Sequence, residues 1–190
     1  MQKAELRKIY LQKRKTLSND EVFLLSHKIF EKLIHYFKPK KGDKVHIFLP
    51  IKKFNEIETR PFIEYCFKND IRVFVPKVVG EDLISIEIDI HTKYIKSQWG
   101  IEEPLTNQDS GEIDFDFIIT PLLYCDARGN RVGYGKGFYD RLFSMVSSKT
   151  KKIGVNYFNP DVIIDDVWEK DIPLDYLVTP TDVLSFLKGG

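Results

Sequence analysis

Apolar and polar residues follow a helical period at the start of the chain. Residues 1–16 place a few apolar side chains among lysine, arginine and glutamine, which predicts an amphipathic helix with a basic outer face. Ser18 and Glu21 have the spacing of a capping box and predict the start of a second helix. Its apolar residues recur three and four positions apart and predict one buried face: Val22, Leu25, Ile29, Leu33 and Phe37. Pro39 and Gly42 predict the end of this helix.

From Val45 onward the pattern changes to short apolar runs rich in β-branched and aromatic residues. These runs predict strands: VHIFLP, IRVFVP, LISIEIDI, FDFIITP, KKIGVNY and DYLVTP. Proline cannot donate to a strand ladder, so we expect pairing to stop at Pro50, Pro76, Pro121 and Pro180. Continuous apolar runs are typical of strands covered on both faces, and residues 57–68 and 138–146 have the pattern of crossover helices. The sequence therefore predicts an α/β fold: a three-layer α/β/α, Rossmann-like, mostly parallel sheet with an N-terminal helical segment.

Two further patterns refine this fold. Residues 83–90 alternate strictly between isoleucine and other residues, which predicts a half-exposed strand near a sheet edge. Residues 106–112 are polar and rich in turn-forming residues, so we expect a surface loop. We find no repeat and no long linker, and at 190 residues we expect a single domain over residues 1–190.

Composition and charge limit the function classes. With 43% hydrophobic and 30% charged residues the chain has an ordinary globular composition, which excludes disordered, collagen-like and disulfide-scaffold proteins. The formal net charge is +1, so no overall field would draw the protein to nucleic acid or to an anionic membrane. Any anion-binding site must therefore be local.

Cysteine usage and apolar runs predict the compartment. Cys66 and Cys125 are too few for a disulfide framework and lack metal-ligand spacing, which favours a reducing cytosol. No apolar run approaches the roughly 20 residues of a transmembrane helix, and residues 1–16 lack the apolar stretch of a signal peptide. We therefore expect a cytoplasmic protein.

The most unusual segment reads DARGNRVGYGKGFYDR, from Asp126 to Arg141. Three glycines at alternate positions precede an apolar helical stretch. Glycine lets backbone N–H groups approach a ligand, and the helix that follows adds its unpaired N–H groups and the positive end of its dipole. Lys136, between Arg131 and Arg141, supplies positive charge for a polyphosphate, and Asp140 could hold magnesium. The segment predicts a binding site for the phosphates of ATP.

Other interpretations of this segment stay open on the residues alone. A flexible turn or tight hairpin also explains a glycine triplet. The spacing is that of neither the P-loop nor the dinucleotide fingerprint. An isomerase or transferase acting on phosphorylated sugars could use the same loop, because glycines flanked by cations can bind any phosphate. A nucleic-acid-binding module using the basic N-terminal helix is a third reading, against which the near-neutral charge argues.

The chain resembles the 5-formyltetrahydrofolate cyclo-ligase family over nearly its whole length. The run D-x-x-G-N-R-x-G-x-G-K-G-F/Y-Y-D carries this resemblance, and residues 126–140 fill every fixed position. Weaker elements follow in the family's order: K-x-x-x-R at Lys3 and Arg7, E-x-E-T at residues 56–59, W-G-I-x-x-P at residues 99–104, and DIPLD with VT at residues 171–179.

The resemblance implies substrates and site residues. It implies an ATP- and magnesium-dependent ligase acting on a folate, with ATP bound by Lys3, Arg7, Arg131, Val132, Gly133, Tyr134, Gly135, Lys136, Gly137, Phe138 and Tyr139. It implies folate contacts from Leu49, Glu56, Trp99, Tyr134, Gly135, Lys136, Gly137 and Phe138, and magnesium ligation by Asp140 and Asp171. The expected catalytic residues are Lys136, Arg131 and Tyr139. We expect a monomer whose partners are the folate and ATP, without nucleic acid or membrane.

The chain departs from the family pattern at two places. Tyr134 stands where members often carry arginine, and residues 50–52 read Pro-Ile-Lys where serine and methionine are frequent.

Other residues with chemically active side chains have ordinary explanations. Glu56 and Glu58 could suggest acid–base catalysis, but we favour Glu56 as a hydrogen-bond partner of a ligand and Glu58 as structural. Cys125 has no histidine nearby, so we interpret it as buried and inert. We assign no role to the scattered histidines His27, His35, His46 and His91.

Overall fold

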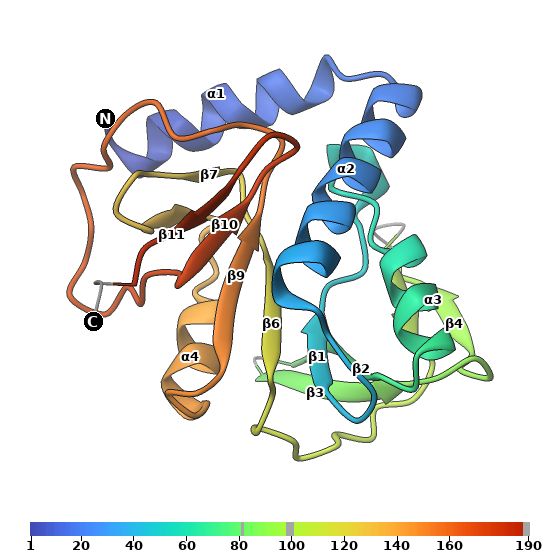
Figure 1. Cartoon of the computed structure of the whole chain (residues 1–190). Helices are drawn as coiled ribbons and strands as arrows, with labels where there is room; N and C mark the ends of the chain where they lie inside the picture. Colours follow the sequence, from blue (N-terminus) through green and yellow to red (C-terminus); the bar gives the residue numbers. More distant parts are fainter. Residues whose placement is uncertain (81, 98–100, 188–190) are drawn as a thin grey trace.

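A central sheet organises the protein in the computed structural model, which describes residues 1–80, 82–97 and 101–187 (Figure 1). In this described part, seven strands lie in the order β11-β10-β9-β6-β1-β2-β3. Their bounds are β1 Lys44–Ile47, β2 Arg72–Val79, β3 Asp82–Ile88, β6 Phe117–Pro121, β9 Lys151–Val155, β10 Tyr176–Val178 and β11 Val183–Ser185. Strands β10, β9, β6, β1 and β2 pair in parallel, and β3 and β11 pair antiparallel at the edges. The predicted mostly parallel α/β sheet and the edge position of the 83–90 strand are confirmed.

The strand order creates a topological switch point between β1 and β6. From β1 the chain moves outward to β2, and it later returns to the other side of β1 to form β6, β9 and β10. The connections thus leave in opposite directions from the carboxyl ends of β1 and β6. In open parallel sheets, ligands bind in the crevice outside such a pair of carboxyl ends.

Helices cover both faces of the sheet. Their bounds are α1 Lys3–Lys15, α2 Asn19–Phe37, the 3-10 helix η1 Lys52–Phe54, α3 Arg60–Lys68 and α4 Phe138–Met145. Buried residues of α2 and α3, among them Leu33 and Phe62, share one core cluster with Ile47 and Ile119 of the sheet. On the other face, Leu142 and Phe143 of α4 pack with Ile118 and Leu177. The predicted crossover helices are therefore confirmed as α3 and α4, and the three-layer arrangement with them.

Helix α1 lies at the carboxyl ends of the strands. Its buried residues Leu6 and Tyr10 pack against Leu123, in the connection from β6 to β7, and against Tyr124, the first residue of β7. Figure 1 shows α1 crossing the top of the molecule above β7. The N-terminal helix therefore closes one side of the region around the switch point.

The start and end of α2 follow the predicted signals. The Ser18 hydroxyl accepts from Glu21 N at 3.2 Å, and the Glu21 carboxylate accepts from Ser18 N at 2.8 Å, so the capping box is confirmed. The helix ends at Phe37 because Lys38 takes the left-handed conformation, with φ of 49°, before Pro39.

Pro76 lies inside β2, so the prediction that pairing stops there is wrong. Parallel pairing with β1 ends at Phe74, but antiparallel pairing with β3 continues to Val79. Pro76 stands opposite Ser85, whose N–H donates to Oδ1 of Asp109 at 3.2 Å and so points away from β2. The two residues form a non-hydrogen-bonded pair, which requires no N–H from proline. The other three prolines end or follow their strands as predicted.

Short strands outside the six predicted runs complete the structure. Besides β11 they form two hairpins: β4 Tyr94–Lys96 with β5 Glu102–Pro104, and β7 Tyr124–Cys125 with β8 Arg131–Val132. Residues 106–112 contain no helix or strand, as expected of the predicted loop.

Both cysteines are buried and unpaired, and burial raises the pKa of the Cys66 thiol to about 12. Within the described ranges, no helix is long and apolar enough to cross a bilayer.

Candidate active site

The β7–β8 hairpin fixes the start of the glycine-rich segment. The buried Asp126 carboxylate accepts hydrogen bonds from the backbone N–H groups of Arg128, Asn130 and Ile164 at 2.9 to 3.2 Å, and from the Asn130 side chain at 3.0 Å. A buried carboxylate with this many donors is satisfied within the protein. Asp126 and Asn130 therefore shape the turn that precedes the loop.

Replacing Gly129 with alanine is expected to lower the free energy of unfolding by about 2–4 kcal/mol, since a strained φ and a steric overlap add up. Gly129 has a φ of +83°, and a Cβ there would lie 2.9 Å from the Leu174 carbonyl oxygen and from the Phe186 ring. Gly111→Ala is a matched control, because Gly111 has a φ of +66° but nothing within 4 Å of its Cβ position. Urea unfolding of both variants measures the difference, and equal losses would contradict the steric part of the prediction.

The glycine loop joins β8 to α4 and contacts α1. Gly135 and Gly137 have φ values of +88° and +68°, and Gly137 is the N-cap of α4. The carbonyl of Gly133 accepts from Nε of Arg7 at 2.9 Å, across 126 positions of sequence. A Cβ on Gly135 would lie 3.5 Å from Nη2 of the same arginine. A guanidinium, exposed backbone and the first N–H groups of a helix thus meet at one place, an arrangement suited to phosphate.

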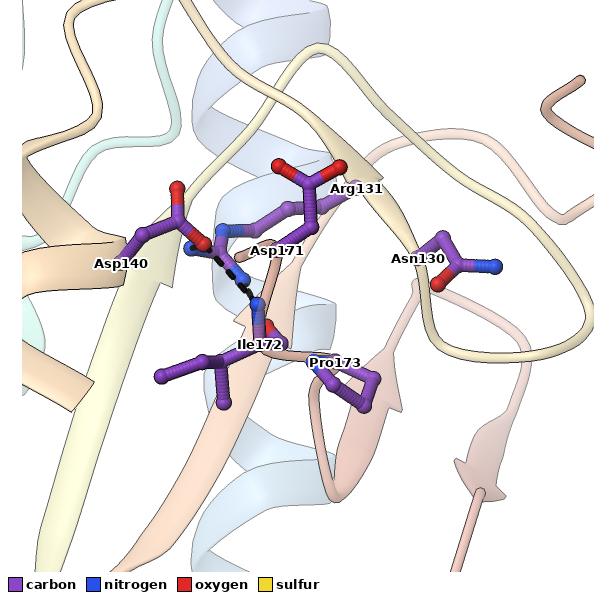
Figure 2. A pocket seen from close by; sticks show the side chains of 6 residues that line it. All are labelled: Asn130, Arg131, Asp140, Asp171, Ile172 and Pro173. Carbon is purple, nitrogen blue, oxygen red and sulfur yellow. Dashed lines mark hydrogen bonds and ion pairs between the residues drawn. The ribbon is translucent and has the colours of Figure 1, made fainter. Parts of the chain in front are cut away.

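A small pocket beside this loop contains the two predicted magnesium ligands (Figure 2). Nζ of Lys3 pairs with Oδ2 of Asp171, and Nη2 of Arg131 pairs with Oδ1 of Asp140 at 2.7 Å. Asp140 Oδ1 also accepts from the Ile172 backbone N–H at 3.1 Å. The pocket has a volume of about 20 Å³ and is lined by Asn130, Arg131, Asp140, Asp171, Ile172 and Pro173. That volume suits a water molecule or a single ion.

The donor set of the pocket fits magnesium. In the part of the chain that the structure describes, no three His, Cys, Asp or Glu side chains form a cluster that could hold a metal. Magnesium does not require one, because it is commonly bound by one or two carboxylates together with substrate phosphates and water. Asp140 and Asp171 supply two carboxylates that line one pocket, where each pairs with a cation, Arg131 and Lys3 respectively. Magnesium ligation by these two residues stays a prediction.

Arg131 lines this pocket and bonds two other residues of its lining. Its side chain is 9% exposed, and it donates to Asp140 and to the Ile172 carbonyl. The guanidinium carbon lies 4.6 Å from the Phe143 ring centroid. Burial lowers the pKa of Arg131, while the neighbouring Asp140 carboxylate acts in the opposite direction. In this structure Arg131 therefore orients the Asp140 carboxylate.

Glu56 lies on the other side of the loop. It is 4% exposed, and its two carboxylate oxygens accept from the Tyr134 hydroxyl and from the Ile51 N–H, both at 2.8 Å. Burial raises the pKa of Glu56, and these two hydrogen bonds oppose that rise. The Phe54 ring lies 5.5 Å from the Tyr134 ring, and half-buried Leu49 follows β1 in the same connection. The structure thus brings three predicted folate contacts to the switch point: Leu49, Glu56 and Tyr134.

Arg14 belongs to this group and was missed in the sequence. It is 2% exposed, donates to the carbonyl of Leu122 after β6, and donates to the Tyr134 hydroxyl at 3.3 Å. A signal was present, because Leu6, Tyr10 and Arg14 are spaced four apart and so share the buried face of α1. The sequence interpretation read the arginines of this helix as its basic outer face.

The remaining predicted residues differ in their surroundings. Lys136 is exposed in the loop, Phe138 is half-buried at the start of α4, and Val132 is buried in β8. The Tyr139 hydroxyl is buried, with no hydrogen-bond partner among the described residues, and its ring lies 6.4 Å from the His46 ring. Its catalytic role stays a prediction. Trp99 lies outside the described residues.

Sequence comparison agrees with this geometry. The model of the 5-formyltetrahydrofolate cyclo-ligase family matches residues 1–180. The chain belongs to that family. It is 33% identical to a 5-formyltetrahydrofolate cyclo-ligase of Mycoplasma pneumoniae over 184 residues, covering 94% of this chain and 98% of that protein. It is 29% identical to the 5-formyltetrahydrofolate cyclo-ligase of Escherichia coli K12, covering 90% and 97%.

Solved structures show the same cyclo-ligase fold. The 5,10-methenyltetrahydrofolate synthetase of Aquifex aeolicus superposes with a TM-score of 0.83 at 34% identity, covering all of this chain and 95% of the other. The synthetase of Mycoplasma pneumoniae gives a TM-score of 0.71 at 30% identity, with coverage of 95% and 99%. The fold and family inferred from the glycine-rich motif are therefore confirmed.

Proposed function

We propose that this protein converts 5-formyltetrahydrofolate to 5,10-methenyltetrahydrofolate with MgATP, releasing ADP and phosphate. The observation that carries the proposal is the position of one loop between two sites. Gly133 accepts a hydrogen bond from Arg7 of α1, while the next residue, Tyr134, bonds Glu56 at the switch point. Phosphates bound at the loop and a folate bound near Glu56 would therefore be neighbours.

The chemistry needs this proximity. The formyl oxygen of an amide is a poor leaving group, and transfer of the γ-phosphoryl group onto it forms an O–P bond as the bond to ADP breaks. N10 then attacks the formyl carbon, the new C–N bond forms, phosphate leaves with the former formyl oxygen, and N10 loses its proton. No enzyme nucleophile takes part, so catalysis rests on positioning and on charge stabilisation.

The residues of the site have corresponding roles. Lys136, exposed on the loop, would offset the charge that develops on the phosphoryl oxygens. Lys3 and Arg7, four apart on α1, would bind the polyphosphate from the opposite side. Asp140 and Asp171 would hold magnesium, which neutralises phosphate charge when bound.

A direct assay tests the proposal. Purified protein is mixed with 5-formyltetrahydrofolate and MgATP, and the near-ultraviolet absorbance of the methenyl product is followed, with controls lacking ATP or magnesium. An increase in this absorbance that requires both ATP and magnesium would establish the reaction. A flat trace from folded protein that binds ATP would exclude the folate, and failure to bind ATP would favour a phosphorylated sugar as substrate.

Changing Asp140 to asparagine is expected to raise the magnesium concentration for half-maximal activity by about tenfold, or 1.4 kcal/mol. Asparagine keeps an oxygen for Arg131 and Ile172 but loses the negative charge that fits the cation. A magnesium titration at saturating ATP and folate measures the change. Glu169→Gln, an exposed change near Asp171, is the control, and equal magnesium dependence in wild type and D140N would exclude Asp140 as a ligand.

A further inference from the structure

A buried arginine, a half-buried tyrosine and a buried glutamate form a continuous chain at the switch point. Arg14 comes from the last turn of α1, Tyr134 from the glycine loop, and Glu56 from the segment before α3. Arg14 donates to the Tyr134 hydroxyl at 3.3 Å, and Tyr134 bonds Glu56 at 2.8 Å. Arg14 and Glu56 are only 2% and 4% exposed, so both charges are removed from water.

The direction of these hydrogen bonds follows from the chemistry of the three groups. A guanidinium only donates, and an ionised carboxylate only accepts. The Tyr134 hydroxyl therefore accepts from Arg14 and donates its single proton to Glu56. Burial, together with the Glu56 charge, raises the pKa of this phenol, so it keeps the proton that the chain requires.

Arg14 supplies the positive charge that faces Glu56. The titratable groups that face Glu56 are Arg14 from α1, Tyr134 from the loop, Tyr139 from α4 and Tyr157 after β9. The pKa values of the three tyrosines are raised by burial, so all three stay neutral. Among the described residues facing Glu56, the opposite charge thus comes from Arg14. A buried carboxylate without such a partner takes up a proton instead of staying charged.

The backbone fixes Arg14 in place independently of Glu56. Nδ2 of Asn55 donates to the Arg14 and Leu17 carbonyls at 3.0 and 2.9 Å, which ties the end of α1 to the residue next to Glu56. The guanidinium also donates to the Leu122 carbonyl. The cation is therefore held at a set position relative to the carboxylate.

We infer that Arg14 is a positioning residue of the folate site, holding Glu56 ionised and fixed in direction through Tyr134. This inference rests on the proposed function. An ionised carboxylate accepts N–H groups of a pterin ring, whereas a protonated one offers a donor and fewer acceptor sites. The Tyr134 hydroxyl stands between the two charges and links them by its two hydrogen bonds.

Three variants test the inference: Arg14→Gln, Tyr134→Phe and the control Lys15→Gln, which removes a charge from an exposed position of the same helix. Affinity for 5-formyltetrahydrofolate is measured by calorimetry from pH 5 to pH 8, and the KM for ATP by steady-state kinetics. We expect R14Q and Y134F to weaken folate binding about tenfold at pH 7, and R14Q to leave the KM for ATP within about twofold, because Arg14 is not among the expected ATP contacts.

The pH profile separates positioning from general damage. Removing Arg14 lets the pKa of Glu56 rise, so we expect the acidic midpoint of folate binding to move up by about one pH unit or more. K15Q should keep the wild-type midpoint, and Arg14→Lys, which restores the charge, should recover part of the shift. If R14Q does not fold, as judged by its thermal transition, Y134F decides, since it loses a single hydroxyl.

Unchanged midpoints in R14Q and Y134F, or equal losses for folate and ATP in R14Q, would overturn the inference. That failure differs from failure of the proposed function. If wild type binds and converts 5-formyltetrahydrofolate but the variants show no shift, only the role of Arg14 is rejected. If wild type binds no folate at any pH, the proposed function is rejected with it.

Discussion

Replacing Lys136 with alanine is expected to lower kcat by about 100- to 1,000-fold without changing the temperature of unfolding, the loss typical of one well-placed charge-stabilising donor. Lys136 is exposed on the loop between Gly135 and Gly137, and it makes no ion pair with any described residue. Its ammonium group therefore supports no packing and remains available to a phosphoryl group.

The control for this experiment is Lys149→Ala, which removes an exposed lysine in the turn after α4. Both variants are compared by the rate of methenyl product formation at saturating substrates and by thermal unfolding. K149A should match wild type in both. A K136A variant with near-normal turnover would remove Lys136 from the mechanism, and one with a lowered unfolding temperature would indicate a structural role.

The parts of the fold that local chemistry determines could be predicted from the sequence. The capping box at Ser18 fixes the start of α2 through its own hydrogen bonds, without help from distant residues. The parallel strands were visible because burial on both faces requires continuous apolar runs. Pro76 shows the limit, since whether its missing N–H matters depends on the pairing phase with Ser85, which a single strand cannot reveal.

Short elements stabilised by tertiary contacts could not be predicted. β7 and β8 have two residues each, too few for a periodic pattern, and their hairpin depends on the hydrogen bonds that Asp126 accepts. β11 exists because it pairs with β10 at the sheet edge. In each case the stabilising partner lies outside the element itself.

The candidate site divides in the same way. The glycine loop was singled out because its residue types and spacing reflect the chemistry of a phosphate ligand, whereas Lys3 and Arg7 were expected only from the family resemblance. Arg14 was not found, because its role depends on Tyr134 and Glu56, which lie 120 and 42 positions away in sequence. Buried charge in a helix gives no local signal beyond its position on the apolar face. Such residues are identified in the structure, by inspecting which positively charged side chains are buried.

Replacing His46 with leucine is expected to remove a large part of the acid sensitivity of the fold. His46 lies in β1 with 0% exposure, and neither imidazole nitrogen has a hydrogen-bond partner among the described residues. Burial lowers the pKa of His46 from 6.5 to about 3. Below pH 6.5 the unfolded chain therefore binds a proton that the folded chain does not, so stability falls as the pH falls.

The size of the effect follows from the width of that pH window. One proton bound to the unfolded state costs about 1.4 kcal/mol per pH unit, so wild type should lose about 2–3 kcal/mol through His46 between pH 7 and pH 4.5. At pH 7 the substitution itself should cost little, because leucine removes both unpaired polar atoms. Glu56 acts in the opposite direction, since its raised pKa lets the folded state take up a proton first, but it is common to both proteins and cancels in their difference.

Chemical unfolding of wild type, His46→Leu and the exposed control His91→Gln across pH 4.5 to 7.5 measures this difference. The curves of wild type and H91Q should run together, and that of H46L should fall less steeply below pH 6.5. Parallel curves for wild type and H46L would show that His46 does not carry the proton difference. The sheet strand that leads to the proposed folate site would then contain a histidine that titrates as freely in the folded protein as in the unfolded chain.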